Sequence, residues 1–372
     1  MIHSAYIIST QRTAFLAPVL NYESRYPSFY KSYFDADESR QEVEQAFSRG
    51  LAYAGHSLMV PEKFSYQVRP HFNDRYVLFN QGENYELISN VCLHRQAQLL
   101  EGQGRARSIV CKLHCWGYDN TGQLKGAPHF KDAPSGLLKK ESLSVWNGLL
   151  FRGQSPDMDL SALKLEDYLD FTDYFYAGSE TTEYQFNWKT FIEIYLENYH
   201  VYSMHPGLRQ FVKPDDLEWS FGDDFSVQKV GLGDQLTKRT TPRYREFQDA
   251  LLARFGQTLP RFGAIWCFLY PNIMIEWYPD IIVVSTIYPK GAGACVNHVE
   301  FYYPEALYKD MPDYFAAEKA AYMETAVEDE EACLLLEKGR RALYLSGEEE
   351  HGPIEPFLEA GVAHFYDWLA KQ

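Results

Sequence analysis

The sequence lacks a long apolar run and a recognisable secretory leader. No stretch reaches the roughly 18 uninterrupted apolar residues that a membrane-spanning helix needs. The first twenty residues place Gln11, Arg12 and Thr13 between short apolar pieces, whereas a signal peptide has a basic start followed by an unbroken apolar core. We therefore expect a cytoplasmic protein that has no membrane partner.

Cysteine is sparse, and its distribution excludes one class of protein. The chain has six cysteines in 372 residues, at Cys92, Cys111, Cys115, Cys267, Cys295 and Cys333. Disulfide frameworks belong to short secreted domains with dense cysteine spacing. A reducing compartment is therefore expected, and the sequence contains no internal repeat or low-complexity tract that would indicate a fibrous or solenoid protein.

Basic residues are also scarce relative to acidic ones. The chain has 35 Lys and Arg against 51 Asp and Glu, which gives a formal net charge of −16. Binding to nucleic acid needs a basic face, so a nucleic-acid partner is not expected. A basic redox partner or a cationic substrate would suit this charge better, although a negative net charge also serves solubility alone.

The length and the 46% hydrophobic content predict two domains with packed cores. Residues 1–55 are expected to form an extended arm and an amphipathic helix over Asp35–Tyr53, both packed on the larger domain. Residues 56–170 contain short β-rich pieces separated by turn residues, which predicts a small all-β domain with its last strand over Val145–Phe151.

Residues 171–372 combine apolar strands with helices. The runs Ile265–Tyr288 and Ala294–Tyr303 are interrupted at Pro271 and Pro279, which favours adjacent strands of a large antiparallel sheet. Helices are expected over Trp188–Met204, Pro312–Arg341 and Glu355–Lys371. The expected fold class is therefore α+β, with an all-β domain followed by a larger domain of antiparallel sheet and helices.

Two short hooks in the small domain have the residue types of a metal site. Cys92-Leu93-His94 is followed after sixteen residues by Cys111-Lys112-Leu113-His114. Each hook offers one sulfur and one nitrogen, so a [2Fe–2S] cluster can take Cys92 and Cys111 on one iron and His94 and His114 on the other. Tetrahedral zinc is the alternative, although zinc sites generally use like pairs. Buried cysteines with capping histidines are the structural alternative.

A second set of candidate ligands lies in the larger domain. Glu197, His200 and His205 follow one another at spacings of three and five residues. On a helix, Glu197 and His200 share a face, and His205 can turn toward the same point if the backbone unwinds before Pro206. Two histidines and one carboxylate with open positions form the facial triad of non-haem Fe(II) oxygenases. A pair of ordinary core or surface histidines is the alternative.

Together the two sets resemble the terminal oxygenase (alpha) component of the Rieske non-haem iron oxygenases, over nearly the whole chain. The resemblance implies a Rieske [2Fe–2S] domain and a helix-grip, START-like catalytic domain. It implies that His200 and His205 bind a mononuclear Fe(II). It also implies that Glu197 bridges to a cluster histidine of the next subunit, and that a downstream carboxylate completes the iron site.

Asp329 best matches that third ligand, because it precedes Lys338-Gly339 at about the family spacing. Other carboxylates on the same expected helix remain alternatives, namely Glu324, Glu328, Glu330 and Glu331. After the second hook, Cys115 departs from the family's small or basic residue, and we expect it to be a buried thiol.

Glutamate at position 197, where most members have aspartate, is similar to the subgroup that oxidises carnitine, choline or betaines. The segments Gly352–Pro356 and Phe365–Leu369 are similar to that subgroup too. A quaternary ammonium substrate could be held by cation–π contacts with four aromatic residues of the predicted strands, Trp266, Tyr270, Trp277 and Tyr278. Aromatic residues on core strands are more often packing residues.

The resemblance predicts an enzyme that hydroxylates or oxidatively dealkylates a small organic molecule. O2 would be the co-substrate, and electrons from NAD(P)H would arrive through a flavin or ferredoxin-type reductase. They would leave the cluster through a histidine such as His114, and a head-to-tail homotrimer would bring this histidine to Glu197. Two alternatives are an aromatic-ring-hydroxylating dioxygenase alpha subunit and a Rieske electron carrier whose iron site is vestigial.

Overall fold

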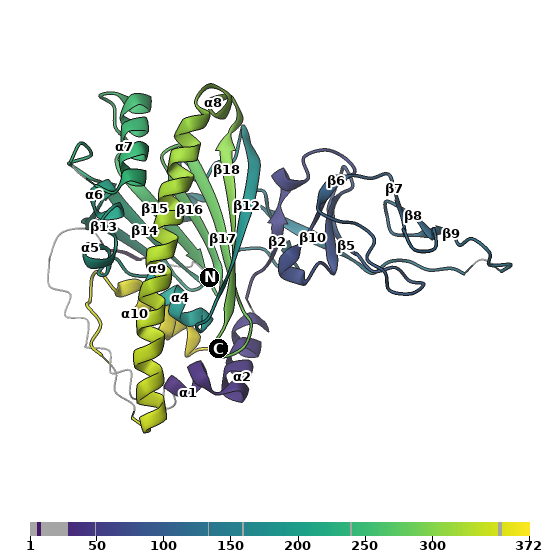
Figure 1. The fold of residues 1–372 in the computed structure, drawn as a ribbon, viewed down its shortest axis with the longest axis horizontal. Coiled ribbons are helices and arrows are strands. Elements are labelled where there is room, and N and C mark those ends of the chain that lie inside the picture. The colour runs from purple at the N-terminus through teal and green to yellow at the C-terminus, as the bar shows by residue number, and fades with distance from the viewer. Residues whose placement is uncertain are drawn as a thin grey trace. The chain divides into compact units, whose positions relative to one another are not determined.

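The computed structural model describes residues 6–8, 29–48, 50–132, 134–157, 160–238, 240–348 and 352–372. The chain forms two compact units, a smaller one over Leu51–Asp159 and a larger one that combines Met1–Gly50 with Leu160–Gln372 (Figure 1). Most of the predicted N-terminal arm lies outside the described residues. Within the described part of the chain, no helix has the length and apolar character needed to cross a membrane.

The smaller unit is built from two antiparallel sheets. A seven-stranded sheet has the order β2-β11-β10-β5-β4-β3-β6 and a three-stranded sheet has the order β7-β8-β9. The strands are β2 (Ala52–His56), β3 (Ser65–Val68), β4 (Tyr76–Asn80), β5 (Tyr85–Ser89), β6 (Gln103–Arg105), β7 (Ser108–Val110), β8 (Gly117–Asp119), β9 (Leu124–Gly126), β10 (Lys140–Trp146) and β11 (Leu149–Arg152). Short 3-10 helices lie at Ser57–Met59 and Pro70–Phe72.

Two details of this unit differ from the sequence prediction. The predicted last strand over Val145–Phe151 is instead a hairpin between β10 and β11. Asn147 and Gly148 form its turn with φ of 49° and 79°, which suits the two-residue turn that the twist of a hairpin favours. Residues 52–55, which were predicted to belong to the N-terminal segment, form most of β2 and pair with β11.

The larger unit contains an eight-stranded antiparallel sheet of order β1-β13-β14-β15-β16-β17-β18-β12. Its strands are β1 (Tyr6–Ile8), β12 (Tyr174–Tyr184), β13 (Val212–Gly222), β14 (Phe225–Leu232), β15 (Phe262–Leu269), β16 (Ile273–Tyr278), β17 (Ile281–Pro289) and β18 (Cys295–Pro304). The predicted runs of β-branched and aromatic residues therefore supply four neighbouring strands, β15 to β18. The α+β fold class is confirmed.

Helices cover this sheet, and the longest, α9 (Pro312–Ser346), lies across one face of it (Figure 1). Pro312 stands at the helix start, where its missing N–H costs nothing, and Gly347 ends the helix in the left-handed region at φ 70°. The other helices are α1 (Phe29–Phe34), α2 (Ala36–Ser48), α3 (Leu160–Leu163), α4 (Trp188–Tyr195), α5 (Val201–Met204), α6 (Leu208–Phe211), α7 (Pro242–Phe255), α8 (Glu305–Asp310) and α10 (Ala360–Leu369).

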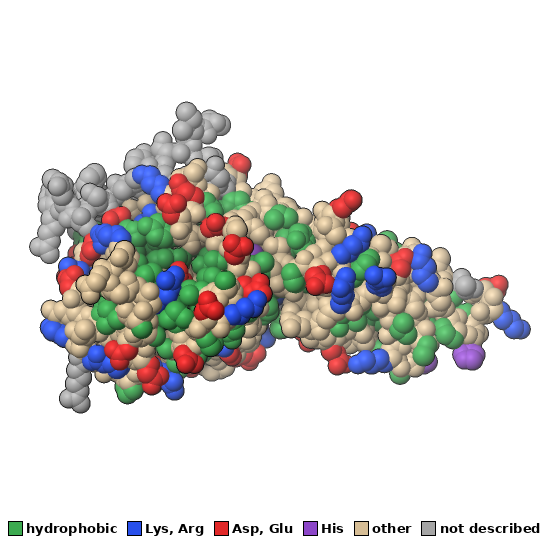
Figure 2. All heavy atoms as spheres, turned by 90° about the horizontal axis from the view of Figure 1, so that it is seen from above, with side chains coloured by type: hydrophobic (Ala, Val, Ile, Leu, Met, Phe, Trp, Pro, Cys, Tyr) green, Lys and Arg blue, Asp and Glu red, His purple; other side chains and the backbone are tan. Residues whose placement is uncertain are grey.

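The described N-terminal helices α1 and α2 belong to the larger unit and pack against its other elements through buried polar contacts. The hydroxyl of Tyr33 on α1 donates to Glu193 on α4, and Lys189 pairs with Glu42 on α2. Asp35 caps the start of α2, because its carboxylate accepts hydrogen bonds from the backbone N–H groups of Asp37 and Glu38 at 2.9 and 3.0 Å. On the face that Figure 2 displays, acidic and basic side chains are interspersed.

Candidate metal centre and substrate cavity

The segment that carries the two histidines is not one continuous helix. α4 ends at Tyr195 and α5 begins at Val201, so the prediction of a single helix from Trp188 to Met204 is wrong. Glu197 explains the break, because its carboxylate accepts hydrogen bonds from the backbone N–H groups of Tyr199 and His200. A side chain that satisfies these donors replaces the helical hydrogen bonds locally. Glu197 and His200 therefore meet through a turn.

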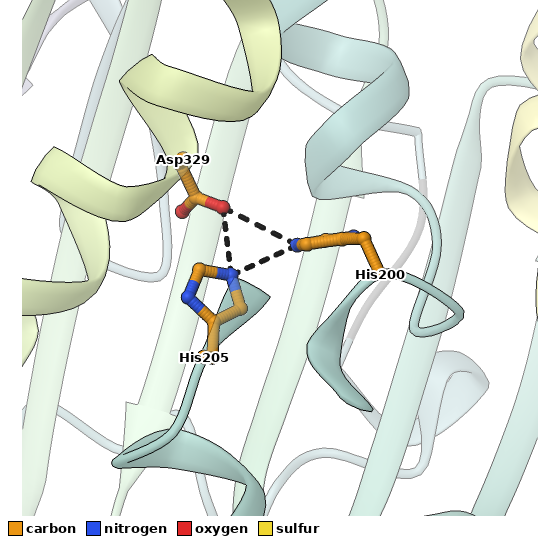
Figure 3. Close-up of side chains that lie close together, drawn as sticks. All are labelled: His200, His205 and Asp329. Carbon is orange, nitrogen blue, oxygen red and sulfur yellow. Dashed lines mark hydrogen bonds and ion pairs between the residues drawn. The ribbon is translucent and has the colours of Figure 1, made fainter. Parts of the chain in front are cut away.

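His200, His205 and Asp329 converge at one point beneath α9 (Figure 3). Their ligand atoms all lie within 4.8 Å of one another. Nε2 of His200 is 2.9 Å from Nε2 of His205. Oδ1 of Asp329 is 3.0 Å from Nε2 of His205 and 3.3 Å from Nε2 of His200. It is the one group of this kind found among the described residues. Two imidazole nitrogens and one carboxylate oxygen make the donor set of a facial triad.

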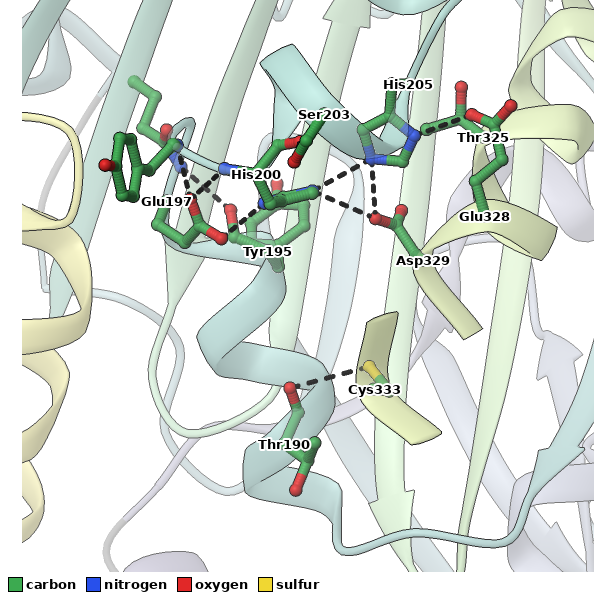
Figure 4. Close-up of polar contacts among 12 residues, drawn as sticks. Thr190, Tyr195, Glu197, His200, Ser203, His205, Thr325, Glu328, Asp329 and Cys333 are labelled. Atoms are coloured by element: carbon green, nitrogen blue, oxygen red, sulfur yellow. Dashed lines mark hydrogen bonds and ion pairs between the residues drawn. The ribbon is translucent and has the colours of Figure 1, made fainter. Parts of the chain in front are cut away.

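A glutamate holds the outer nitrogen of each histidine (Figure 4). Nδ1 of His200 contacts Glu197, and Nδ1 of His205 lies 2.7 Å from Oε2 of Glu328. Such carboxylate partners fix the ring orientation and the tautomer of a metal-binding histidine. Glu328, one of the alternative third ligands, therefore lies on the outer side of His205, whereas Asp329 lies on the inner side.

The charges around the histidines favour a cation at this centre. Burial alone would lower the pKa of His200, but hydrogen bonds to Asp329 and Glu197 raise it to about 10. Burial likewise opposes the charge on His205, yet Asp329 and Glu328 raise its pKa to about 9. The pKa of Asp329 is held well below its ordinary value by the two histidines, although burial opposes this. A metal ion would supply the positive charge that protons supply here.

The two cysteine–histidine hooks of the smaller unit fold into similar loops. The N–H of Cys92 donates to the carbonyl of Ala97, and the N–H of Cys111 donates to that of Trp116, both at 2.9 Å. Gln96 and Cys115 occupy equivalent positions with φ of 58°. This backbone geometry leaves Cys115 exposed, so the expectation of a buried thiol there is wrong.

The four residues predicted to bind the cluster lie in these two loops. Cys92 and Cys111 are 2% and 1% exposed, and the rings of His94 and His114 lie 4.6 Å apart. Nδ1 of His94 is buried and makes no hydrogen bond to a described residue. A buried ring nitrogen without a donor or acceptor is costly unless it binds something, so these residues fit a [2Fe–2S] group.

Tyr118 touches the sulfur of one of these cysteines. Its hydroxyl accepts a hydrogen bond from the N–H of Leu93 at 3.0 Å and lies 3.2 Å from Sγ of Cys92. The hydroxyl proton is therefore free to point at the sulfur. Hydrogen bonds to cluster sulfurs are one of the means by which a protein sets a reduction potential.

A cavity extends from the histidine–aspartate centre between the sheet and α9. Its volume of about 90 Å³ compares with about 10–15 Å³ for one water molecule in the same measure, so it suits a small molecule. Its walls include Met274, Tyr278 and Val299 from the strands and Tyr322 and Thr325 from α9. The lining residues are alternate residues of each strand and recur every three or four residues on the helix, so they come from one face of each element.

Two buried carboxylates that the sequence did not single out also line this cavity. Glu276 on β16 and Glu318 on α9 are 3% and 2% exposed. Burial raises the pKa of Glu276 to about 7 and that of Glu318 to about 8. Glu276 was detectable, because it interrupts the apolar strand Ile273–Tyr278. Glu318 was not, because α9 carries many other carboxylates.

The predicted aromatic box does not assemble as expected. Trp266 and Tyr278 line the cavity, but the lining does not include Tyr270 or Trp277. Trp277 alternates with Glu276 and Tyr278 on β16 and so points to the opposite face, where it contacts Tyr168. Tyr270 lies beyond the end of β15, and its hydroxyl is 2.7 Å from Nδ1 of His364.

Comparisons with known proteins agree with this architecture. The Rieske [2Fe-2S] domain matches residues 51–140, and the ring hydroxylating alpha subunit (catalytic domain) matches residues 171–372. Putrescine 2-hydroxylase of Ralstonia nicotianae is 46% identical over 341 residues, which cover 91% of this chain and 93% of that protein. The carnitine monooxygenase oxygenase subunit of Escherichia coli is 24% identical over 362 residues, which cover 91% of each.

A solved structure shows the same fold. A quaternary ammonium Rieske monooxygenase superimposes with a TM-score of 0.71 at 20% identity, covering 92% of this chain and 94% of that chain. The expected cofactors, a Rieske [2Fe–2S] cluster and a mononuclear iron with O2 as co-substrate, are those of this family. The chain belongs to the ring-hydroxylating alpha subunits of the Rieske oxygenases and is a terminal oxygenase that acts on a small molecule.

Proposed function

We propose that this oxygenase hydroxylates a short aliphatic diamine of the size of putrescine. The observation that carries the proposal is the cavity that joins the triad of His200, His205 and Asp329 to the buried carboxylates Glu276 and Glu318. A diamine has an ammonium group at each end at neutral pH. One ammonium can pair with the carboxylates while a carbon atom near the other lies at the triad. The identity of 46% to a putrescine 2-hydroxylase supports the same class.

The cavity suits a primary ammonium better than a quaternary ammonium or an aromatic hydrocarbon. A primary ammonium has three N–H donors, and buried carboxylates supply acceptors. A quaternary ammonium has no donor, and only two of the four aromatic residues predicted to surround one, Trp266 and Tyr278, line this cavity. An aromatic hydrocarbon would leave the buried Oε2 atom of Glu318 without a hydrogen-bond donor, which is costly.

We assign the mononuclear iron to His200, His205 and Asp329, whose inner atoms converge. We assign the cluster to Cys92, Cys111, His94 and His114 in the two similar loops. When bound, the cluster delivers electrons and the iron activates O2. Converting one C–H bond to C–OH consumes one O2, two electrons and two protons and releases one water, and the electrons come from NAD(P)H through a flavin or ferredoxin-type reductase.

The protein's own residues then have separate tasks. Glu197 and Glu328 keep the inner nitrogens of the histidines directed at the centre. The aromatic and aliphatic walls of the cavity, such as Phe247 and Val299, exclude bulk water. The buried carboxylates place the substrate so that one carbon atom lies at the reactive position.

A head-to-tail homotrimer is part of the proposal. Leu93 and Leu113, within the two hooks, are 41% and 59% exposed, and Tyr199, two residues after Glu197, is 58% exposed. Exposed apolar side chains at both ends of the proposed electron path favour burial against another chain. Glu197 would then bridge to a cluster histidine of that chain. We place the protein in the cytoplasm, since its six cysteines are free.

Substrate-dependent O2 uptake tests the proposed function. The reconstituted protein, with a reductase and NAD(P)H, is offered putrescine, carnitine and naphthalene in parallel. Putrescine should give the highest kcat/KM and a product one oxygen atom heavier. Faster uptake with carnitine or naphthalene, accompanied by their hydroxylated products, would refute the diamine assignment.

A further inference from the structure

The cavity wall contains a built acceptor site around Glu276. Glu276 accepts hydrogen bonds from the hydroxyls of Tyr278 at 2.8 Å and Tyr322 at 3.1 Å. The indole N–H of Trp266 donates to the hydroxyl of Tyr278 at 3.0 Å. This chain of hydrogen bonds fixes the position of the Glu276 carboxylate, although its burial would otherwise be costly.

Glu318 is held less completely than Glu276. Its Oε2 atom is buried and makes no hydrogen bond to a described residue, and the hydroxyl of Tyr195, also on the cavity wall, makes none either. Buried polar atoms in native structures nearly always have a partner. Two unpartnered polar atoms on the wall of one cavity therefore indicate a ligand that donates hydrogen bonds.

The charge balance indicates the sign of that ligand. Burial raises the pKa of Glu318, and the negative charge of Glu276 raises it further. Lys319, the nearby cation, is already paired with Glu180 at 2.6 Å. A cation placed between Glu276 and Glu318 would relieve their repulsion and satisfy the open acceptor.

We propose that Glu318, with Glu276, binds the ammonium group of the diamine that lies farther from the iron, and so makes the enzyme specific for diamines over monoamines. The inference rests on the proposed function and names the residues that select the substrate. Glu318 acts directly, through its open oxygen, whereas Tyr278 and Tyr322 are positioning residues for Glu276.

The spacing along α9 is compatible with this arrangement. Asp329 follows Glu318 by eleven residues, which is about 16 Å along the helix axis. It follows Tyr322 by seven residues, which is about 10 Å. A four-carbon diamine needs roughly 6 Å between its nitrogens, ~3 Å for the ammonium–carboxylate contact and ~4 Å to the metal. The required span of about 13 Å lies between these two separations.

Steady-state kinetics with matched substrates test the assignment. Putrescine and 1-aminobutane differ only in the second amino group. In Glu318→Gln, kcat/KM for putrescine should fall roughly 10- to 100-fold, as expected for loss of a charged hydrogen-bond acceptor. In the same variant, kcat/KM for 1-aminobutane should change less than about threefold, because that substrate has no second ammonium. Glu246→Gln, an exposed position on α7, makes the same charge change as a control.

Equilibrium binding separates this inference from the proposed function. Calorimetric titration of putrescine into the anaerobic protein should show tight binding in the wild type and in Glu246→Gln, and weak binding in Glu318→Gln. Tyr322→Phe, which keeps all carboxylates, should weaken binding less and provides a second test if Glu318→Gln fails to fold. If the wild type hydroxylates putrescine but Glu318→Gln binds it as tightly as the wild type does, the assignment of Glu318 is overturned and the proposed function stands. A wild-type protein that neither binds nor hydroxylates putrescine would overturn the proposed function, and the assignment with it.

Discussion

Nε2 of His205 lies 3.0 Å from Oδ1 of Asp329, a residue 124 positions further along the chain. His205 follows α5, and Asp329 lies near the middle of α9. The pair therefore exists only because α9 packs across the sheet above the broken segment between α4 and α5. The candidate iron site is thus a consequence of tertiary packing, and each of its parts can be tested separately.

Replacing the candidate carboxylate ligand should remove one metal only. Asp329→Ala should lower the iron content from about three to about two atoms per chain, because a cluster retains two irons while the triad loses its anionic donor. Iron analysis and the visible absorption of the cluster measure both sites. Glu331→Ala, exposed on the same helix, is the matched control. Full iron in Asp329→Ala would transfer the role to another carboxylate such as Glu328.

Glu197→Gln should separate electron transfer from metal binding. An amide at position 197 can still contact His200, so iron should remain at about three atoms per chain, but it cannot supply the charged bridge that we propose between subunits. Turnover should fall at least about tenfold, the loss of a charged hydrogen bond. Single-turnover oxidation of the reduced cluster should slow in parallel. Wild-type turnover in this variant would exclude the bridge.

Tyr118→Phe should lower the reduction potential of the cluster. The hydroxyl lies 3.2 Å from Sγ of Cys92, and a hydrogen bond to sulfur stabilises the reduced state, which carries more negative charge. A redox titration followed by the visible spectrum measures the change, with the iron content as the control for cluster assembly. An unchanged potential with full iron would show that the hydroxyl does not donate to the sulfur.

Glu318→Gln should make the ligand-free protein more heat-stable at high pH. The folded-state pKa of Glu318 is raised to about 8 from its ordinary 4.5, so its contribution to stability is fully present below about pH 4.5 and is lost as the pH rises through 8. The neutral amide avoids this loss, which is on the order of 5 kcal/mol for such a pKa difference. The Tm of the variant should exceed that of the wild type by several degrees at pH 8 and by little at pH 5. A difference that does not depend on pH would contradict the account.

The sequence was most informative where the determinants are local. Cys92 with His94 and Cys111 with His114 are adjacent in the chain, and the runs that form β15 to β18 show strand patterns by composition alone. The break at Glu197 was missed, because a side chain that captures two backbone donors is not visible as a change in hydrophobic period.

Long-range packing determined what the sequence could not predict. The inward direction of Asp329 and the outward role of Glu328 depend on how α9 is rotated on the sheet. Glu276 on β16 and Glu318 on α9 line one cavity, although they are far apart in the sequence. Neither relation has a local signal, so the cavity could be recognised only in three dimensions.

Isotope analysis of the product tests the central claim most directly. The reconstituted enzyme, supplied with putrescine and a reductase under ¹⁸O2, should yield a hydroxylated diamine that contains one atom of ¹⁸O. NAD(P)H and O2 should be consumed in equal amounts with the product formed. A protein with both metal sites filled that forms no hydroxylated putrescine would contradict the account.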